Sequence, residues 1–183
     1  MNVEFIGECL LRKELFQPTL EAEGRILLLI DAFSSKSNSG LEGRTKLAKL
    51  DFFVRYPKFL KRALDIKGVD AHSKFSISES NDIESRMVRY KFGPWDPSYF
   101  SLLGRLIGKK LIQVTPTSKG LNYKTTSEGH MLARKLADQD CWSEIEERIS
   151  LLKRNFNLSG SALKNFIYQN FPEVSESKWG DEL

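Results

Sequence analysis

The segment from Met87 to Leu136 constrains the fold most, because its local signals predict one specific order of elements. Asp96 and Pro97 precede an apolar run, and an acidic N-cap followed by proline at the first helical position marks a helix start. The apolar residues that follow recur at the spacing of one helix face: Tyr99, Leu102, Leu103, Leu106 and Ile107. Gly108 suits the position just past the end of this helix.

The remainder of the segment predicts a hairpin and a second helix. Residues 111–114 suit a strand, a turn follows around Pro116 and Gly120, and residues 121–125 suit the returning strand. Thr126 or Ser127 would cap the last helix, with Glu128 in its first turn. A strand, a helix, a hairpin and a helix in this order are typical of the second half of a winged helix-turn-helix. A helix and hairpin that serve only as core are the simpler alternative.

The rest of the chain predicts further helices, so the expected fold class is mainly α with a small β-wing (α+β), a winged helix-turn-helix core with additional N- and C-terminal helices. Helical spacing predicts helices over residues 20–34, 41–56, 58–66, 141–156 and 159–171. Thr19 is the expected cap of the first helix and Ser159 that of the last. The first helix has one candidate buried face, made of Leu20, Ile26, Leu27, Ile30 and Phe33.

Polar segments divide the chain. Residues 34–40 read as a flexible linker, residues 67–81 as a Ser-rich loop, and Pro172 as the end of the last helix. We therefore expect a winged-helix domain with an N-terminal helical part over 1–140, a helical extension over 141–171 and an acidic tail over 172–183.

The composition predicts a cytoplasmic protein without a membrane span. The longest apolar cluster, Ile26 to Ile30, is far too short to cross a bilayer. The first ten residues lack the basic region of a signal peptide. Cys9 and Cys141 stand far apart, which favours reduced thiols, with a single long-range disulfide as the alternative.

Positive charge is concentrated in two regions. The net charge of the chain is +4, but residues 44–62 carry +6 and residues 86–124 carry +7, so the remainder is acidic. Such clustering predicts a face for double-stranded DNA, and ordinary solvated helix faces are the alternative. The candidate DNA-binding residues are Arg86, Arg89, Lys91, Arg105, Lys109, Lys110, Lys119, Lys124, Arg44, Lys46, Lys58, Lys61 and Arg62. No set of base-reading side chains stands out, so binding indifferent to sequence is expected.

The sequence does not predict catalysis. It contains no Gly-rich phosphate loop, and its two histidines, His72 and His130, are not at metal-ligand spacing with Cys, Asp or Glu. No nucleophile with a neighbouring base is suggested. We therefore expect a binding protein that needs no cofactor or metal of its own.

Two strings taken together resemble a known family. The first is RTKLAKLDFFVRYPKFL, from Arg44 to Leu60, and the second is ESRMVRYKFGPWD, from Glu84 to Asp96, followed by Tyr99 and RLIGKKLIQV. Over roughly residues 24 to 140 the chain resembles the small middle subunit of Lamassu-type, or ABC three-component, defence systems. The resemblance implies a non-catalytic subunit that bridges an SMC-like coiled-coil ATPase and a nuclease effector, in an assembly that senses phage or plasmid DNA. ATP and magnesium would then belong to the partner.

The apolar stripe of the 141–156 helix is the candidate surface for docking on a coiled coil. The candidate partner-binding residues are Ile145, Ile149, Leu152, Phe156 and Trp179. The alternative is that the stripe belongs to the chain's own core. A rival function is a winged-helix transcription regulator, which should be a symmetric dimer on a palindromic site.

Overall fold

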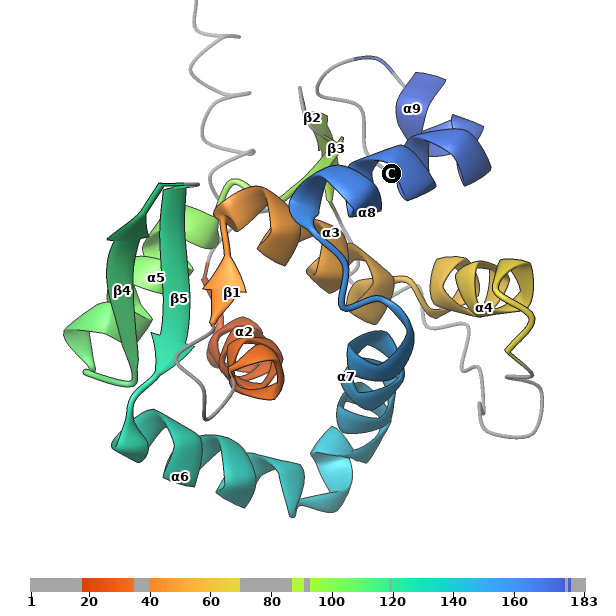
Figure 1. The fold of residues 1–183 in the computed structure, drawn as a ribbon. Coiled ribbons are helices and arrows are strands. Elements are labelled where there is room, and N and C mark those ends of the chain that lie inside the picture. The colour runs from red at the N-terminus through yellow and green to blue at the C-terminus, as the bar shows by residue number, and fades with distance from the viewer. Residues whose placement is uncertain are drawn as a thin grey trace, which may run out of the picture.

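The computed structural model describes residues 18–34, 40–69, 87–90, 93–118, 120–176 and 178, with the side chains of residues 89, 90 and 175 excepted. It confirms the α+β class: helices predominate, and a small three-stranded antiparallel sheet lies at one side of them (Figure 1). None of the helices in these residues is long and apolar enough to cross a membrane.

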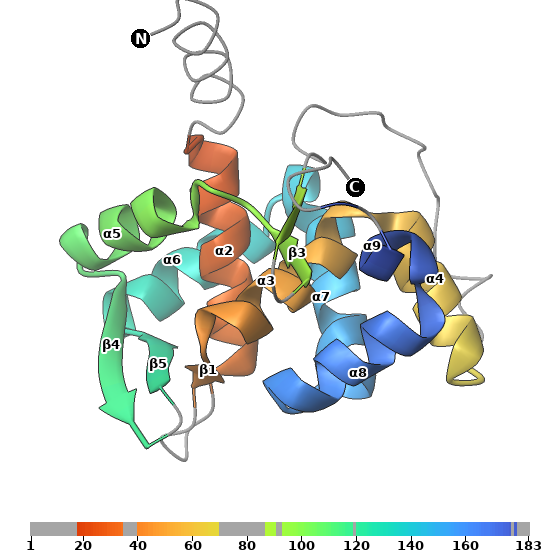
Figure 2. The same ribbon diagram turned by 90° about the horizontal axis from the view of Figure 1, so that it is seen from above.

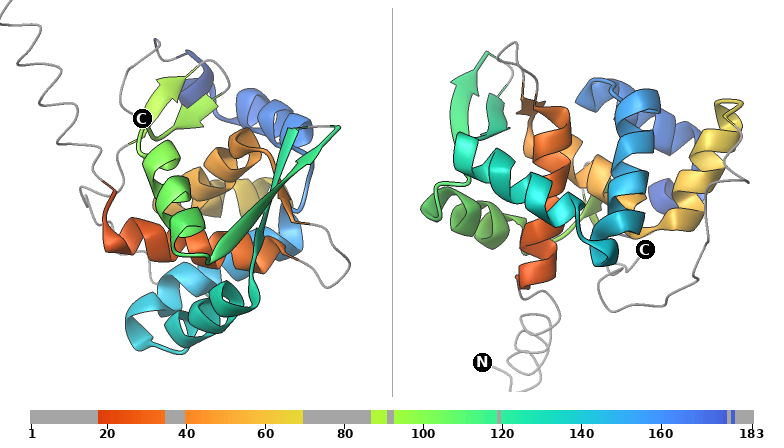
Figure 3. Two further views of the ribbon diagram at one scale, coloured as in Figure 1. Left: turned by 90° about the vertical axis from the view of Figure 1, so that its left-hand side faces the viewer. Right: turned by 90° about the horizontal axis from the view of Figure 1, so that it is seen from below.

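Helix α2 (Leu20–Phe33) is the centre of the fold. The Thr19 hydroxyl accepts a hydrogen bond from the Ala22 N–H at 3.0 Å, as the predicted cap requires. Every residue from Ala22 to Ile30 is buried, because α3, α5, α6 and α7 all pack around this helix. Figure 3 shows α6 crossing it. Of the five residues predicted to share a buried face, Ile26, Leu27, Ile30 and Phe33 are buried, but Leu20, in the first turn, is 76% exposed.

The sheet has the strand order β1-β5-β4. Strands β4 (Ile112–Thr117) and β5 (Gly120–Thr125) form the predicted hairpin. Strand β1 (Leu41–Glu42) pairs with β5 through Leu41 opposite Tyr123. The sequence predicted helix from residue 41, which is wrong for its first three residues. Gly43 instead takes a positive φ of 82° and its N–H donates to the Leu121 carbonyl at 2.8 Å, which turns the chain into α3.

Helix α3 (Arg44–Arg55) is followed directly by α4 (Pro57–Ile66), with Pro57 in its first turn. Strands β2 (Val88–Tyr90) and β3 (Gly93–Trp95) then form a second hairpin, and β3 packs on α3.

Helix α5 (Tyr99–Gly108) begins two residues later than its signals predict. The Asp96 carboxylate accepts hydrogen bonds from the Ser98 N–H at 2.7 Å and the Ser98 hydroxyl at 2.6 Å, so it caps the turn before the helix. Gly108 is the last helical residue rather than the residue past the end. Lys110 takes the positive φ of 57° instead.

The C-terminal helices pack into the same core. Helix α6 (Ser127–Ala137) is capped by Thr126, as predicted. A 3-10 turn, η2 (Asp140–Trp142), replaces the first turn of the predicted 141–156 helix, and α7 (Ser143–Asn155) follows it. Helix α8 (Gly160–Asn170) is capped by Ser159. Pro172 starts α9 (Pro172–Glu176) rather than a tail, because Val174 is buried. One apolar cluster extends from Ala22 to Val174, so the segment after residue 140 shares the core of the preceding part.

The two strings that carry the family resemblance meet in a buried polar network. Arg25 Nε donates to Asp51 Oδ1 at 2.8 Å, and the Tyr99 hydroxyl donates to Asp51 Oδ2 at 2.7 Å. Arg55 Nη1 donates to Asp96 Oδ2 at 2.5 Å and lies 3.8 Å from Asp51 Oδ2. Burial and Asp51 raise the pKa of Tyr99 well above its usual value. These residues join α2, α3 and the start of α5, so at least part of the resemblance rests on structural residues.

Candidate anion-binding pocket

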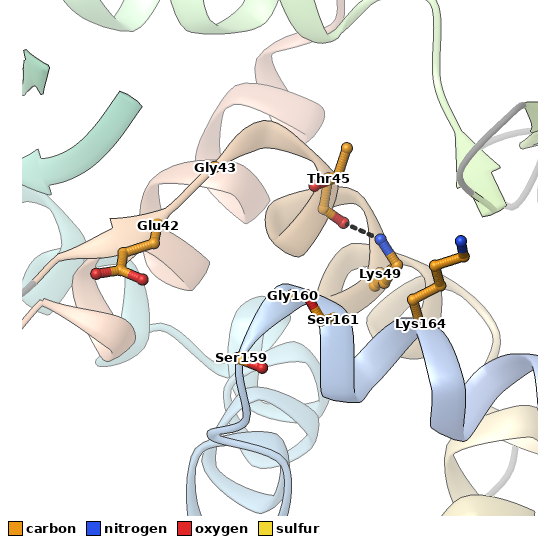
Figure 4. A pocket seen from close by; sticks show the side chains of 8 residues that line it. All are labelled: Glu42, Gly43, Thr45, Lys49, Ser159, Gly160, Ser161 and Lys164. Atoms are coloured by element: carbon orange, nitrogen blue, oxygen red, sulfur yellow. Dashed lines mark hydrogen bonds between the residues drawn. The ribbon is translucent and has the colours of Figure 1, made fainter. Parts of the chain in front are cut away.

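A cavity of about 670 Å³ lies between the N-terminal ends of α3 and α8 (Figure 4). Its lining comes from two segments more than a hundred residues apart in the chain, because α8 packs on α3. The lining residues are Glu42, Gly43, Thr45, Lys49, Ser159, Gly160, Ser161 and Lys164. This volume is within the range of small-ligand sites.

Both helices present their N-terminal ends to this cavity. Gly43 precedes α3 and provides no side-chain cap, and the Ser159 hydroxyl caps α8 by accepting from the Ala162 N–H at 3.2 Å. First-turn N–H groups carry the partial positive charge of the helix dipole and bind anions such as phosphate. The backbone at both ends of the pocket therefore favours negative charge.

Lys49 places a buried ammonium group in the pocket. Lys49 is only 2% exposed, and its Nζ donates a hydrogen bond to the Thr45 carbonyl at 3.0 Å. Within the described part of the chain Lys49 makes no ion pair. Burial, together with the neighbouring Lys164, lowers the pKa of Lys49 to about 8. A buried charge without a counter-ion is unfavourable. An anion in the cavity would supply that counter-ion.

Two further lysines extend the positive region. Lys46 Nζ donates to Asn157 Oδ1 at 3.5 Å, and Lys46 and Lys153 both lie over the Phe33 ring, at 5.5 and 4.9 Å from its centroid. Burial lowers the pKa values of both Lys46 and Lys153. The positive charge of Lys153 lowers the pKa of Lys46 further, whereas the negative charge of Glu42 raises it. In Figure 4 the Glu42 carboxylate points away from Lys49 and Lys164. We call Lys46, Lys49, Lys153 and Lys164 the lysine cluster.

The groups that line this site suit an anion. Apart from the Glu42 carboxylate, they are ammonium, hydroxyl and backbone N–H donors, which match the oxygens of a phosphate. Nowhere in the described residues do three or more His, Cys, Asp or Glu side chains gather as metal ligands would.

The predicted basic residues of the first region fall into two separate places. Arg44 and Lys46 lie at the start of α3, near the pocket. Lys58, Lys61 and Arg62 lie on α4, which Figure 2 shows on the far side of the molecule from the β4–β5 hairpin. Arg62 donates to Glu173 and to the Asn170 carbonyl, both at 2.5 Å, and thereby holds the C-terminal helices.

The predicted basic residues of the second region are partly engaged within the fold. Arg105 (at 3.1 Å) and Lys109 both pair with Glu23 of α2. Burial raises the pKa of Glu23, but the hydrogen bonds and positive charges of Lys109 and Arg105 together outweigh burial and leave the pKa lowered. Lys110 is exposed and Lys124 is half-buried. Arg86, Lys91, Lys119 and the side chain of Arg89 lie outside the described residues.

The apolar stripe expected to dock a partner is mostly internal. Ile149, Leu152 and Phe156 are fully buried in the chain's own core, and Ile145 is half-buried against it. These three side chains are therefore not on the surface for a partner in this conformation. Trp179 lies outside the described residues.

Sequence reasoning missed Lys49, Lys153 and Lys164 as site residues. The only local signals were Gly43 and the Ser159-Gly160-Ser161 string, each at a helix start. Nothing in the sequence indicates that the two helix ends face each other.

Fold and pocket together define a mainly helical α+β protein with a cationic pocket suited to phosphate oxygens. Comparison of the chain with protein-family models, with curated proteins and with solved structures finds no match.

Because Lys49 loses its proton near pH 8, sulfate binding should weaken between pH 7 and pH 9. Sulfate remains a dianion over this range, so only the protein titrates. If the protonated lysine alone binds, affinity should fall about tenfold. Calorimetric titration at the two pH values measures this. Lys49→Met should bind weakly at both, and a wild-type affinity independent of pH would contradict the assignment.

Proposed function

We propose that this chain is a non-catalytic, DNA-binding bridging subunit of a Lamassu-type complex, together with an SMC-like ATPase and a nuclease effector. The observation that carries DNA binding is the pocket between α3 and α8, where Lys49 and Lys164 meet two helix N-terminal ends. Lysines and helix ends of this kind bind backbone phosphates, which position a protein on DNA without reading its sequence. The complex itself is proposed from the resemblance of the two strings.

The order of the elements supports a winged-helix interpretation. Helix α2, strand β1, helix α3, helix α5 and the β4–β5 hairpin follow one another, and β1 pairs with β5. In this interpretation α5 occupies the position of the recognition helix and the hairpin is the wing. Helix α4 and the β2–β3 hairpin would be an insertion between α3 and α5.

The surface of α5 argues for binding that is indifferent to base sequence. Its exposed residues are Phe100, Ser101, Gly104, Arg105, Ile107 and Gly108. Base edges are read chiefly by Arg, Lys, Asn, Gln, Asp and Glu side chains, and the single such side chain here, Arg105, is engaged with Glu23 and the Pro18 carbonyl. A winged-helix transcription regulator, favoured by the same topology, remains the second candidate.

Removing the charges of Lys49 and Lys164 together should weaken DNA binding. If each ammonium neutralises one phosphate, the double variant Lys49→Gln/Lys164→Gln should reduce the slope of log K against log salt by about 2. Fluorescence anisotropy with a labelled duplex at several salt concentrations measures that slope. Lys58→Gln/Lys61→Gln on α4 removes the same charge from outside the pocket lining and should leave the slope nearly unchanged. Equal losses in both double variants would show that the pocket makes no special contact.

Co-expression of the tagged chain with its neighbouring genes tests the complex. Native mass measurement should find an assembly that contains a coiled-coil ATPase. A free symmetric dimer that prefers a palindromic site would instead favour the regulator.

A further inference from the structure

Helix α5 carries an apolar strip on its outer side, where the Phe100 ring centroid lies 6.0 Å from that of Trp95. Figure 2 shows the helix at the edge of the molecule. Phe100 and Ile107 are 60% and 45% exposed, and a Cβ atom added at Gly104 or Gly108 would meet nothing within 4 Å. The four residues recur at helical spacing and share one side of α5. We call Phe100, Gly104, Ile107 and Gly108 the α5 face.

Basic side chains border this face. The Arg44 guanidinium lies 4.4 Å from the centroid of the Phe100 ring, which orders both side chains before any partner arrives. Arg105 and Lys109 lie toward α2, and Lys110 follows the helix end with its side chain exposed. Of these four basic side chains, Arg105 and Lys109 pair with the single carboxylate of Glu23, so the border remains net positive.

We propose that the α5 face binds an amphipathic helix of a partner protein whose apolar stripe is flanked by aspartate and glutamate. The two glycines allow a second helix backbone to come close, and Phe100 and Ile107 provide its apolar contacts. The basic border favours acidic flanks and disfavours basic ones. Nucleic acid suits this strip poorly, because phosphate contacts need donors and the strip itself offers none.

The inference extends the proposed function by naming a surface for a bridging subunit and the chemistry of what covers it. It does not depend on the lysine cluster, because the pocket lies on α3 and α8. Failure of DNA binding in the pocket variants would therefore leave it intact.

Photo-cross-linking in the co-expressed complex tests the inference. The probe is p-benzoylphenylalanine, placed at Phe100 or, as a control, at Met131 on α6, which is 57% exposed. After irradiation, mass spectrometry of the digested product should map the Phe100 cross-link to one amphipathic segment with carboxylates beside its apolar stripe. A cross-link from Phe100 to DNA or to a second copy of this chain would overturn the proposal. Equal cross-linking yields from Phe100 and Met131 would also overturn it.

Two substitutions give a second readout. Ile107→Ser and Arg44→Glu should each weaken retention in the assembly by about tenfold or more, as loss of a central contact does. Met131→Ser, at a comparably exposed position, should have little effect. Lys49→Gln/Lys164→Gln should retain the assembly while weakening DNA binding. Unchanged retention in both Ile107→Ser and Arg44→Glu, with folding verified by circular dichroism, would overturn the proposal.

Discussion

Replacing Asp51 by alanine should lower the free energy of unfolding by about 3–5 kcal/mol, the cost typical of breaking a buried ion pair. Asp51 is fully buried and accepts hydrogen bonds from Arg25 and Tyr99, with Arg55 close by. Its loss would remove the acceptor of the Arg25 Nε–H group and that of the Tyr99 hydroxyl inside the core. Three elements of the fold depend on this one carboxylate.

Chemical denaturation with urea measures this effect, and the midpoint of thermal unfolding should fall by roughly 6–20 °C. Asp65→Ala on the exposed side of α4 removes the same group from the surface and should change stability by less than about 0.5 kcal/mol. Arg25→Met combined with Asp51→Leu replaces the pair by apolar groups and should recover much of the loss. A small effect of Asp51→Ala would mean that the network is not essential to the fold.

Gly129→Ala should destabilise the protein by about 2–3 kcal/mol, at the upper end of overpacking effects. A Cβ atom at Gly129 would lie 1.8 Å from the Leu111 carbonyl oxygen. That oxygen accepts the Thr126 N–H at 3.0 Å and so joins the start of β4 to the start of α6. The backbone must therefore move, because no side chain is available to make room.

Gly104→Ala is the matched control, since Gly104 is also helical but has open space around it. Alanine there should stabilise the protein by about 0.5–1 kcal/mol, which is the usual helix-propensity gain over glycine. The two substitutions are chemically identical and should act in opposite directions in urea denaturation. The same sign for both would contradict the close approach of Gly129 to Leu111.

Short-range signals explain which parts of the fold were predictable. Thr19, Thr126 and Ser159 cap the helices that they were predicted to cap, and the β4–β5 hairpin forms where its turn residues indicate. Two of the errors concern elements decided by distant partners. Leu41 and Glu42 form a strand because β5 lies beside them, and Pro172–Glu176 form α9, in which Val174 is buried in the core.

The candidate site was less predictable than the fold. The excess of basic residues over 44–62 and 86–124 was visible, but not which of them are already paired. Glu23 engages Arg105 and Lys109 from more than eighty residues away, and Glu173 engages Arg62 across a still longer separation. Lys49 and Lys164 come from segments that no local signal connects.

By itself the sequence determined the caps of α2, α6 and α8, the place where the hairpin turns and the concentration of positive charge, since caps, turns and composition act within a few residues of chain. Only the tertiary structure decided which charges are compensated, which apolar stripe lies inside and which two helix ends form a pocket. These outcomes depend on distances between side chains that are far apart in sequence. Electrostatic and packing energies depend on those distances, and local sequence signals do not specify the distances.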